Sequence, residues 1–196
     1  MPEDTQLSDS DGVFLVKTAR MAVTEFLSNG KRMKLESERE KKFSFNAGVF
    51  VTLNNADGLR GCIGFPMPDK KLSHGIIDAA IAAATEDPRF SPVKTNELNG
   101  IVFEVTVLTP PVEITVTDPM EYLEKIKVGR DGLIIRNSFS SGLLLPQVPV
   151  EYGWNVEEFL QHTCEKAGLE KDAWKNEKVK IEKFEGIVYK EKTNGS

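Results

Sequence analysis

Cysteine and histidine are scarce in this chain of 196 residues, which contains two of each. Cys62 and Cys164 are too few to stabilise a chain of this length by disulfides, and this scarcity favours a reducing compartment such as the cytoplasm. With two histidines and neither a C-x-x-C nor an H-E-x-x-H pattern, a zinc site is disfavoured. The sequence therefore predicts no metal and no cofactor.

Long apolar runs are also missing. No stretch approaches the roughly 20 apolar residues that a membrane helix needs. The start, MPEDTQLSDSDG, lacks the basic and apolar regions of a signal peptide, so we expect no membrane association. The net charge of −5 argues against general capture of nucleic acid. Residues 31–42 nevertheless carry a local net charge of +3, which leaves a phosphate contact there open.

The first half of the chain predicts a helix, a hairpin, a second helix and a strand. Ser10 or Asp11 is suited to cap the first helix, and the Asn-Gly pair at 29–30 to end it. The segments are a strand at 43–53 that pairs with 59–64, a helix capped by Asp69 that runs to about Glu86, and a strand at 100–109.

The second half repeats this order. Asp118, Pro119 and Glu121 have the spacing of a helix start. A hairpin follows over 128–147, then a helix over 155–168 with Asn155 as its cap, and a closing strand over 178–192. The pattern predicts an α+β fold with mixed or mostly antiparallel sheets, flanking helices and a duplicated hairpin-helix-strand architecture.

The most unusual stretch is LRGCIG, residues 59–64. In a regular strand Leu59, Gly61 and Ile63 share one face, with Leu59 and Ile63 as core anchors, so Arg60, Cys62 and Gly64 lie on the other. Two interpretations stay open. Cys62 is a packed thiol among glycines that permit close contact, or it is a thiol activated by the nearby arginine in a partly buried site.

Two further residues need an explanation. Glu104 is a carboxylate in the middle of an apolar strand, and Arg60 and Arg89 are its candidate partners. It is either a structural ion pair or a general base in the same groove as Cys62. Cys164, by contrast, falls within the apolar stripe of its helix, so we expect it to be a core residue.

The stretches GLRGCIG, EDPRFSPV, FEVTVLTPP, GLLLPQV and W…FLQHTCEKAGL occur in this order. Together they resemble the AMMECR domain family, in its microbial branch, over roughly residues 10–190. The resemblance implies two unequal subdomains with a cleft lined by the glycine-rich motif. It divides the chain into a disordered tail at 1–10, one domain of two interleaved subdomains at 11–190, and a second tail at 191–196.

The resemblance also implies an association with Memo-like and radical-SAM proteins, near or fused to which family members are found. We therefore expect a cytoplasmic protein that binds a ligand in this cleft, as an enzyme or enzyme component in a modification pathway with such proteins. Its ligand would be a small molecule or nucleotide. A non-catalytic protein adaptor and a nucleotide- or RNA-binding module are the alternatives. Asp87 and Phe90 also belong to the family motifs. The candidate catalytic residues are Cys62 and Glu104, and the candidate ligand-binding residues are Arg60, Gly61, Gly64, Arg89 and Gln147.

Overall fold

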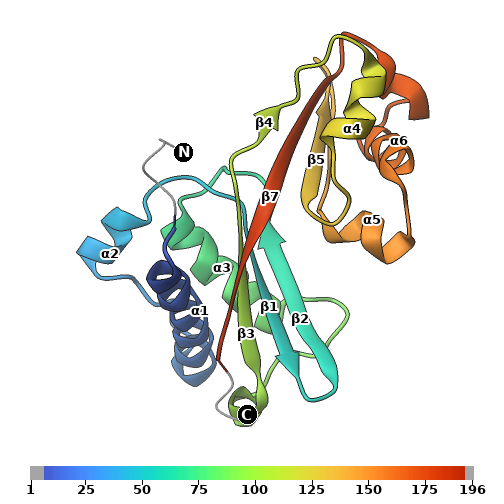
Figure 1. Cartoon of the computed structure of the whole chain (residues 1–196). Coiled ribbons are helices and arrows are strands. Elements are labelled where there is room, and N and C mark those ends of the chain that lie inside the picture. Colours follow the sequence, from blue (N-terminus) through green and yellow to red (C-terminus); the bar gives the residue numbers. More distant parts are fainter. Residues whose placement is uncertain (1–6, 193–196) are drawn as a thin grey trace. The chain divides into compact units, whose positions relative to one another are not determined.

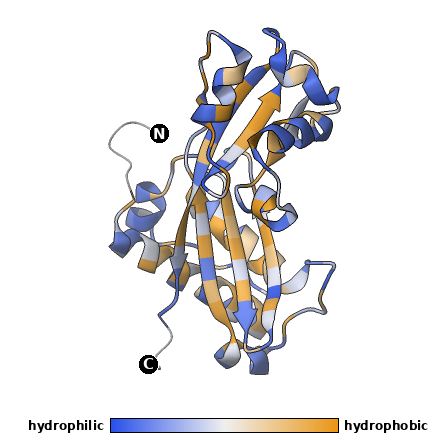
Figure 2. Cartoon of the chain, turned by 45° about the vertical axis from the view of Figure 1, so that its right-hand side comes forward, coloured by the Kyte–Doolittle hydropathy of each residue, from blue (hydrophilic) through white to orange (hydrophobic). Residues whose placement is uncertain are grey.

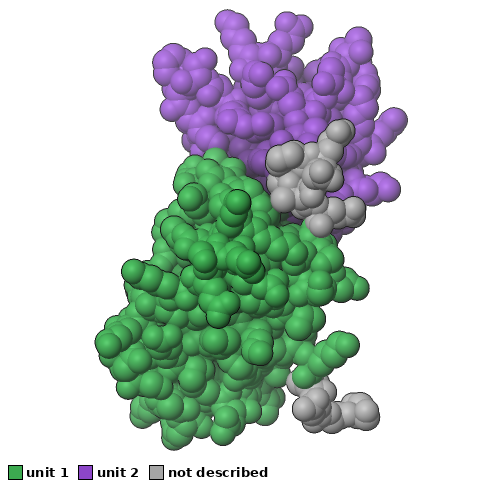
Figure 3. Space-filling model, turned by 90° about the vertical axis from the view of Figure 1, so that its left-hand side faces the viewer, with its two compact units in different colours: residues 1–108, 187–196 green, residues 109–186 purple. Residues whose placement is uncertain are grey.

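A computed structural model describes residues 7–192, which form two compact units (Figures 1 and 3). Unit 1 comprises Met1–Leu108 and Ile187–Ser196, and unit 2 comprises Thr109–Gly186. Both mix helices with antiparallel strands, which confirms the predicted α+β class. The predicted tails at 1–10 and 191–196 fall largely outside the described residues, and the division into subdomains with a cleft stays a prediction.

Unit 1 is built on a hairpin with a third strand beside it. β1 pairs antiparallel with β2 on one side and with β3 on the other. The end of β7 lies beside β3, and just after it the Glu191 amide donates to the Phe103 carbonyl at 3.0 Å. The elements are α1 (Asp9–Asn29), α2 (Ser37–Lys42), β1 (Val49–Asn55), β2 (Gly58–Phe65), α3 (Leu72–Thr85), η1 (Thr95–Gly100), β3 (Val102–Leu108) and, from Ile187 on, β7 (Lys180–Lys190).

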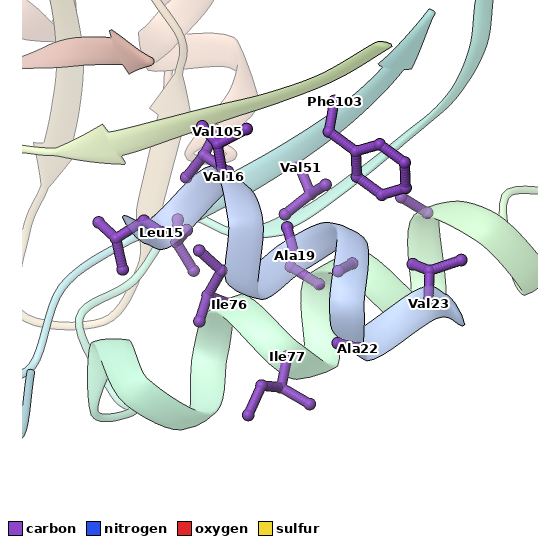
Figure 4. Packing of buried hydrophobic residues seen from close by; sticks show 14 of the residues in the cluster. Leu15, Val16, Ala19, Ala22, Val23, Val51, Ile76, Ile77, Phe103 and Val105 are labelled. Atoms are coloured by element: carbon purple, nitrogen blue, oxygen red, sulfur yellow. The ribbon is translucent and has the colours of Figure 1, made fainter. Parts of the chain in front are cut away.

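Helices α1 and α3 cover one face of this sheet and form the core of unit 1 (Figure 4). Leu15 and Ala19 of α1 meet Ile76 of α3 and Val51 of β1, and none of these four is accessible to solvent. The β strands alternate between buried and partly exposed residues, seen as hydrophobic and hydrophilic bands (Figure 2). This alternation leaves Thr52 and Glu104 on the sheet face opposite the helices.

Unit 2 repeats the strand arrangement. β5 lies between β6 and β7, both antiparallel to it, and the short β4 pairs with β7. The elements are β4 (Val112–Glu113), η2 (Pro119–Glu121), α4 (Tyr122–Lys125), β5 (Asp131–Arg136), β6 (Ser141–Leu144), α5 (Gln147–Tyr152), α6 (Val156–Lys166), η3 (Lys171–Lys175) and the first part of β7. The order β2-β1-β3 thus corresponds to β6-β5-β7, which confirms the duplicated architecture.

Several predicted element boundaries are wrong. Ser8, rather than Ser10 or Asp11, caps α1, and Asp11 completes the capping box from its third position. Asp69 does not cap α3, which begins at Leu72 without a side-chain cap. β1 begins at Val49 rather than at residue 43, because the chain first makes an isolated bridge between Asn46 and Lys71.

The end of β7 is anchored by Glu191, which lies in the predicted tail at 191–196. Arg20 binds both carboxylate oxygens of Glu191, at 2.5 and 2.7 Å, and donates to the carbonyls of Leu98 and Ile101. Glu191 also accepts from the Phe103 amide at 2.9 Å. This residue therefore belongs to the folded part of unit 1. Over the described range 7–192, no helix is both long and apolar enough to span a bilayer.

Candidate functional site

The glycine-rich strand β2 is interrupted by a bulge at Arg60. Leu53 pairs with Gly61, whereas the next residue, Asn54, pairs with Leu59, so Arg60 is the extra residue on β2. A bulge reverses the side-chain alternation beyond it. Leu59 is consequently 42% exposed, and its predicted role as a core anchor is wrong. Ile63, on the regular side of the bulge, packs against the core as predicted.

Gly61 and Gly64 make room for neighbouring groups of the protein. A Cβ atom on Gly61 would lie 2.2 Å from the Ala83 carbonyl oxygen, because helix α3 crosses β2 at this point. A Cβ atom on Gly64 would lie 2.3 Å from the ring of Phe50, its partner on β1. Packing within the protein therefore explains both glycines, which we named as candidate ligand-binding residues.

Asp87, Arg89 and Cys62 form the centre of the site. Asp87 and Pro88 begin a tight turn after α3, in which the Phe90 amide donates to the Asp87 carbonyl at 3.1 Å. The turn directs the Asp87 carboxylate at the edge of β2, where it accepts from the Cys62 amide at 2.8 Å. Arg89 binds the same carboxylate with Nε and Nη2, at 3.0 and 2.8 Å, and Nη2 lies 3.4 Å from the Cys62 carbonyl.

Hydrogen bonding keeps the residues of this turn charged, against the opposing effect of burial. The Asp87 side chain is 2% exposed, and the hydrogen bond from Arg89, with those from the amides of Cys62 and Arg89, holds the pKa of its carboxyl well below the usual range. Asp87 in turn raises the pKa of Arg89. The Arg89 side chain is 55% exposed, so a permanently charged guanidinium is held rigidly at the surface beside Cys62.

Cys62, Thr52 and Glu104 form one row across three strands. Thr52 pairs with Cys62 on one side and with Glu104 on the other. The Thr52 hydroxyl donates to Cys62 Sγ at 3.3 Å. Two strand spacings separate the thiol from the carboxylate by about 10 Å, with Thr52 between them. The structure thus places both candidate catalytic residues on one sheet face, and both are partly exposed.

Arg60 binds within the protein and is unavailable for Glu104. Its Nε and Nη2 bind the carboxylate of Glu97 at 3.0 and 3.3 Å, and Nη1 donates to the Ser91 carbonyl at 2.9 Å. Its side chain is only 13% exposed. Arg89 binds Asp87 through Nε and Nη2, so neither arginine is the ion-pair partner that we expected for Glu104. Arg60 links the bulge of β2 to the loop that carries Asp87.

The comparisons with known proteins agree with this architecture. The AMMECR1 family model matches residues 16–189. The chain belongs to the AMMECR1 family. Protein MJ0810 of Methanocaldococcus jannaschii is 52% identical over 94% of this chain and 92% of its own length. Protein PYRAB00100 of Pyrococcus abyssi is 48% identical over 95% and 93%. The crystal structure of PH0010 from Pyrococcus horikoshii superposes with a TM-score of 0.77 at 49% identity, over 95% of this chain and 94% of that one.

Gln147 and Cys164 of this AMMECR1 family member belong to unit 2. Gln147 is the first residue of α5. Cys164 has no exposed surface, and burial raises the pKa of its thiol to about 11, so its predicted core role is confirmed. No cluster of three or more metal-ligating side chains occurs among the residues that the structure describes.

Three residues of the candidate site, Asp87, Thr52 and Glu97, have no role that is visible in the sequence. Asp87 appeared only as a family motif residue, although it connects Cys62 to Arg89. Thr52 and Glu97 were not singled out. The Asp-Pro pair signals a turn but not which strand edge the turn reaches. For Thr52 a usable signal existed, because strand pairing in a hairpin places a threonine opposite the cysteine.

Proposed function

We propose that unit 1 binds an anionic group of a small-molecule or peptide ligand at Arg89 and presents it to the thiol of Cys62. The observation that carries this proposal is the half-exposed Arg89 guanidinium, which Asp87 holds in a fixed orientation beside Cys62. A preorganised guanidinium loses little freedom when it binds a carboxylate or phosphate. Arg60 lacks such freedom to bind a ligand, because Glu97 and Ser91 already accept its hydrogen bonds.

In this proposal the protein is an enzyme or enzyme component. Cys62 serves as nucleophile, with its sulfur hydrogen-bonded by Thr52. Glu104 acts on the far end of the ligand rather than on the thiol, since the intervening strand separates the two groups. The family resemblance further supports a place in a cytoplasmic modification pathway, with a Memo-like or radical-SAM protein as partner.

The test compares alkylation of Cys62 by anionic iodoacetate and by neutral iodoacetamide, read by peptide mass spectrometry. We expect Arg89→Gln to lower the iodoacetate-to-iodoacetamide rate ratio roughly three- to tenfold, since the guanidinium beside Cys62 attracts the anionic reagent but not the neutral one. The matched control is Arg130→Gln, because Arg130 is a half-exposed arginine bound to a buried aspartate in unit 2. An unchanged ratio in Arg89→Gln would contradict an anion site.

A protein adaptor is the second candidate, and Phe139 favours it. This side chain is 96% exposed on the β5–β6 turn, yet the turn is ordered by Asn137, whose side-chain oxygen accepts from the amides of Phe139 and Ser140 at 2.9 Å each. Aromatic residues, phenylalanine included, are enriched in protein–protein interfaces. A partner pulled down equally by the wild type and by Cys62→Ser, but not by Phe139→Ser, would support this function.

The nucleotide- or RNA-binding alternative has less support. The basic segment 31–42 directs part of its charge to acidic residues of unit 1: Arg32 pairs with Asp78, and Lys42 pairs with Asp11 at 2.5 Å. The positive charge that would attract phosphates is therefore partly neutralised by the fold itself.

A further inference from the structure

The outer edge of strand β2 offers backbone groups to a further strand. β2 stands at one end of the strand order, and β1 is its neighbour on the other side (Figure 1). The Leu108 amide donates to the Gly48 carbonyl at 2.8 Å, so the backbone groups of Gly48 face β3. This direction alternates along a strand, so those of Phe50 also face β3. Gly64, the partner of Phe50 on β2, therefore directs its N–H and C=O groups to the outer edge.

The protein itself occupies this edge at Cys62. By the same alternation the backbone groups of Cys62 point outwards, where Asp87 accepts from the amide at 2.8 Å and Arg89 Nη2 lies 3.4 Å from the carbonyl oxygen. Gly64, two residues further on, is partly exposed, and its amide and carbonyl have no hydrogen-bond partner on this edge within residues 7–192. One donor and one acceptor are thus available to an added strand, which is a common mode of peptide binding.

The contacts at Cys62 limit the length and the direction of an added strand. It cannot pair beyond Gly64, because Asp87 and Arg89 already bind the next outward-facing backbone groups. It therefore ends beside the Arg89 guanidinium, whose Nε and Nη2 bind Asp87 and whose Nη1 has no acceptor among the described residues. A guanidinium binds a carboxylate and repels an ammonium group, so this end is the C-terminus of a peptide. Such a peptide runs antiparallel to β2.

Phe50 supplies an apolar surface for one side chain of this peptide. A Cβ atom on Gly64 would lie 2.3 Å from the Phe50 ring, so the ring leans across Gly64 towards the outer edge. Phe50 is partly exposed. A residue paired with Gly64 directs its side chain to the same sheet face as Phe50, and an apolar side chain there contacts the ring.

We infer that the outer edge of β2 binds the C-terminal segment of an extended peptide. The peptide pairs with both backbone groups of Gly64, an apolar residue lies against Phe50, and the terminal carboxylate binds Arg89. This inference names the ligand class of the proposed function and rests on its anion site.

The test is titration of the ¹⁵N-labelled full chain with the peptide acetyl-Ala-Ala-Leu-Ala, which has a free carboxylate and an apolar penultimate residue. We expect the Gly64 amide signal to move downfield, because the amide gains an acceptor, and to saturate with a millimolar dissociation constant, typical of so small a ligand. The Gly142 amide of β6 in unit 2 serves as internal control and should stay in place.

Two altered peptides separate pairing from charge. The peptide with a methylated leucine nitrogen lacks the donor for the Gly64 carbonyl, and it should not move the Gly64 signal. The peptide with a C-terminal amide should bind roughly three- to tenfold more weakly, because it lacks the charge for Arg89. Arg89→Gln should remove the difference between the acid and the amide, whereas Arg130→Gln, the control in unit 2, should preserve it.

The inference is overturned if the Gly64 signal stays in place, if the methylated peptide moves it equally, or if the amidated peptide binds as tightly as the acid. The alkylation ratio of Cys62 tests the anion site separately. A ratio that falls in Arg89→Gln while the Gly64 signal stays in place would refute the peptide and keep the anion site. An unchanged ratio would refute both.

Discussion

The two units share one arrangement of strands, called the frame below, and differ in the side chains that it carries. Each has a hairpin whose first strand also pairs with a third strand, in the orders β2-β1-β3 and β6-β5-β7. Each second strand carries a glycine against which a helix packs. A Cβ atom would lie 2.2 Å from the Ala83 oxygen at Gly61 and 2.3 Å from the Ala167 nitrogen at Gly142. The glycine of LRGCIG is therefore a feature of the frame.

The two units differ at the residue that follows this glycine. Gly61 is followed by Cys62, which pairs with Thr52, whereas Gly142 is followed by Leu143, which pairs with Ile134. Unit 2 has apolar side chains at the two positions where unit 1 has a thiol and a hydroxyl. The frame explains the fold of both units, and only the polar replacements in unit 1 point to chemistry. This comparison locates the candidate site better than glycine content does.

The largest effect is expected at the shared glycines. Gly61→Ala should lower the free energy of unfolding by about 3 kcal/mol, because the methyl group collides with backbone rather than with a movable side chain. Gly142→Ala should cost a similar amount, measured by urea unfolding. Gly100→Ala is the control, since a Cβ atom there meets nothing within 4 Å. If Gly61→Ala matches Gly100→Ala, the close approach of α3 is wrong.

Next in size is the loss of a buried carboxylate in each unit. Asp131 has no exposed surface, and Arg130 binds it at 2.6 and 2.8 Å, much as Arg89 binds Asp87. Asp87→Asn and Asp131→Asn should each destabilise the protein by about 2 kcal/mol, because each leaves an arginine without its buried partner. Only Asp87→Asn should also lower the iodoacetate preference of Cys62. A loss of that preference in both variants would contradict a site specific to unit 1.

The stability that Asp87 contributes should depend on pH. Its folded pKa lies below the value of about 3.9 for an unfolded aspartate, so the contribution is complete above that value. As the pH falls further, the unfolded chain binds the proton first, and the contribution declines towards the folded pKa. The difference in unfolding free energy between wild type and Asp87→Asn should therefore be smaller at about pH 3 than at pH 7. An equal difference at both values would contradict the lowered pKa.

Much of the fold could be predicted from local patterns. Strand alternation, the capping boxes at Asp118 and Asn155, and the duplicated order all follow from side-chain periodicity and turn chemistry. The orientation of Leu59 could not, because it depends on a bulge that arises only when β1 and β2 are paired. One extra residue reverses the face of every side chain beyond it.

The residues of the candidate site stand out in the sequence, whereas their hydrogen-bond partners do not. Cys62, Arg60 and Arg89 stand out as residue types, yet the Asp87–Cys62 bond joins a turn to a strand edge 25 residues away in sequence. Such a contact depends on how α3 packs on β2, which no local pattern specifies. Asp87 belongs to a motif of the family that the sequence resembles, and the structure shows that it connects Cys62 with Arg89.

The smallest effect we predict is on the thiol itself. Thr52→Val should slow iodoacetamide alkylation of Cys62 about threefold, because the Thr52 hydroxyl stabilises the sulfur when it carries negative charge. Valine keeps the shape and the strand preference of threonine, and it brings this position closer to its counterpart Ile134. The iodoacetate preference should survive, since Arg89 remains in place.

The control for this change is Thr106→Val on β3, which replaces another partly exposed threonine on the same sheet face without touching the sulfur. If Thr52→Val and Thr106→Val alkylate at the wild-type rate, the hydroxyl does not tune the thiol. The pairing of Thr52 with Cys62 would then be a feature of the hairpin, as the Ile134–Leu143 pair is in unit 2. A slower rate in Thr52→Val alone would show that the Thr52–Cys62 pair makes unit 1 chemically different from unit 2.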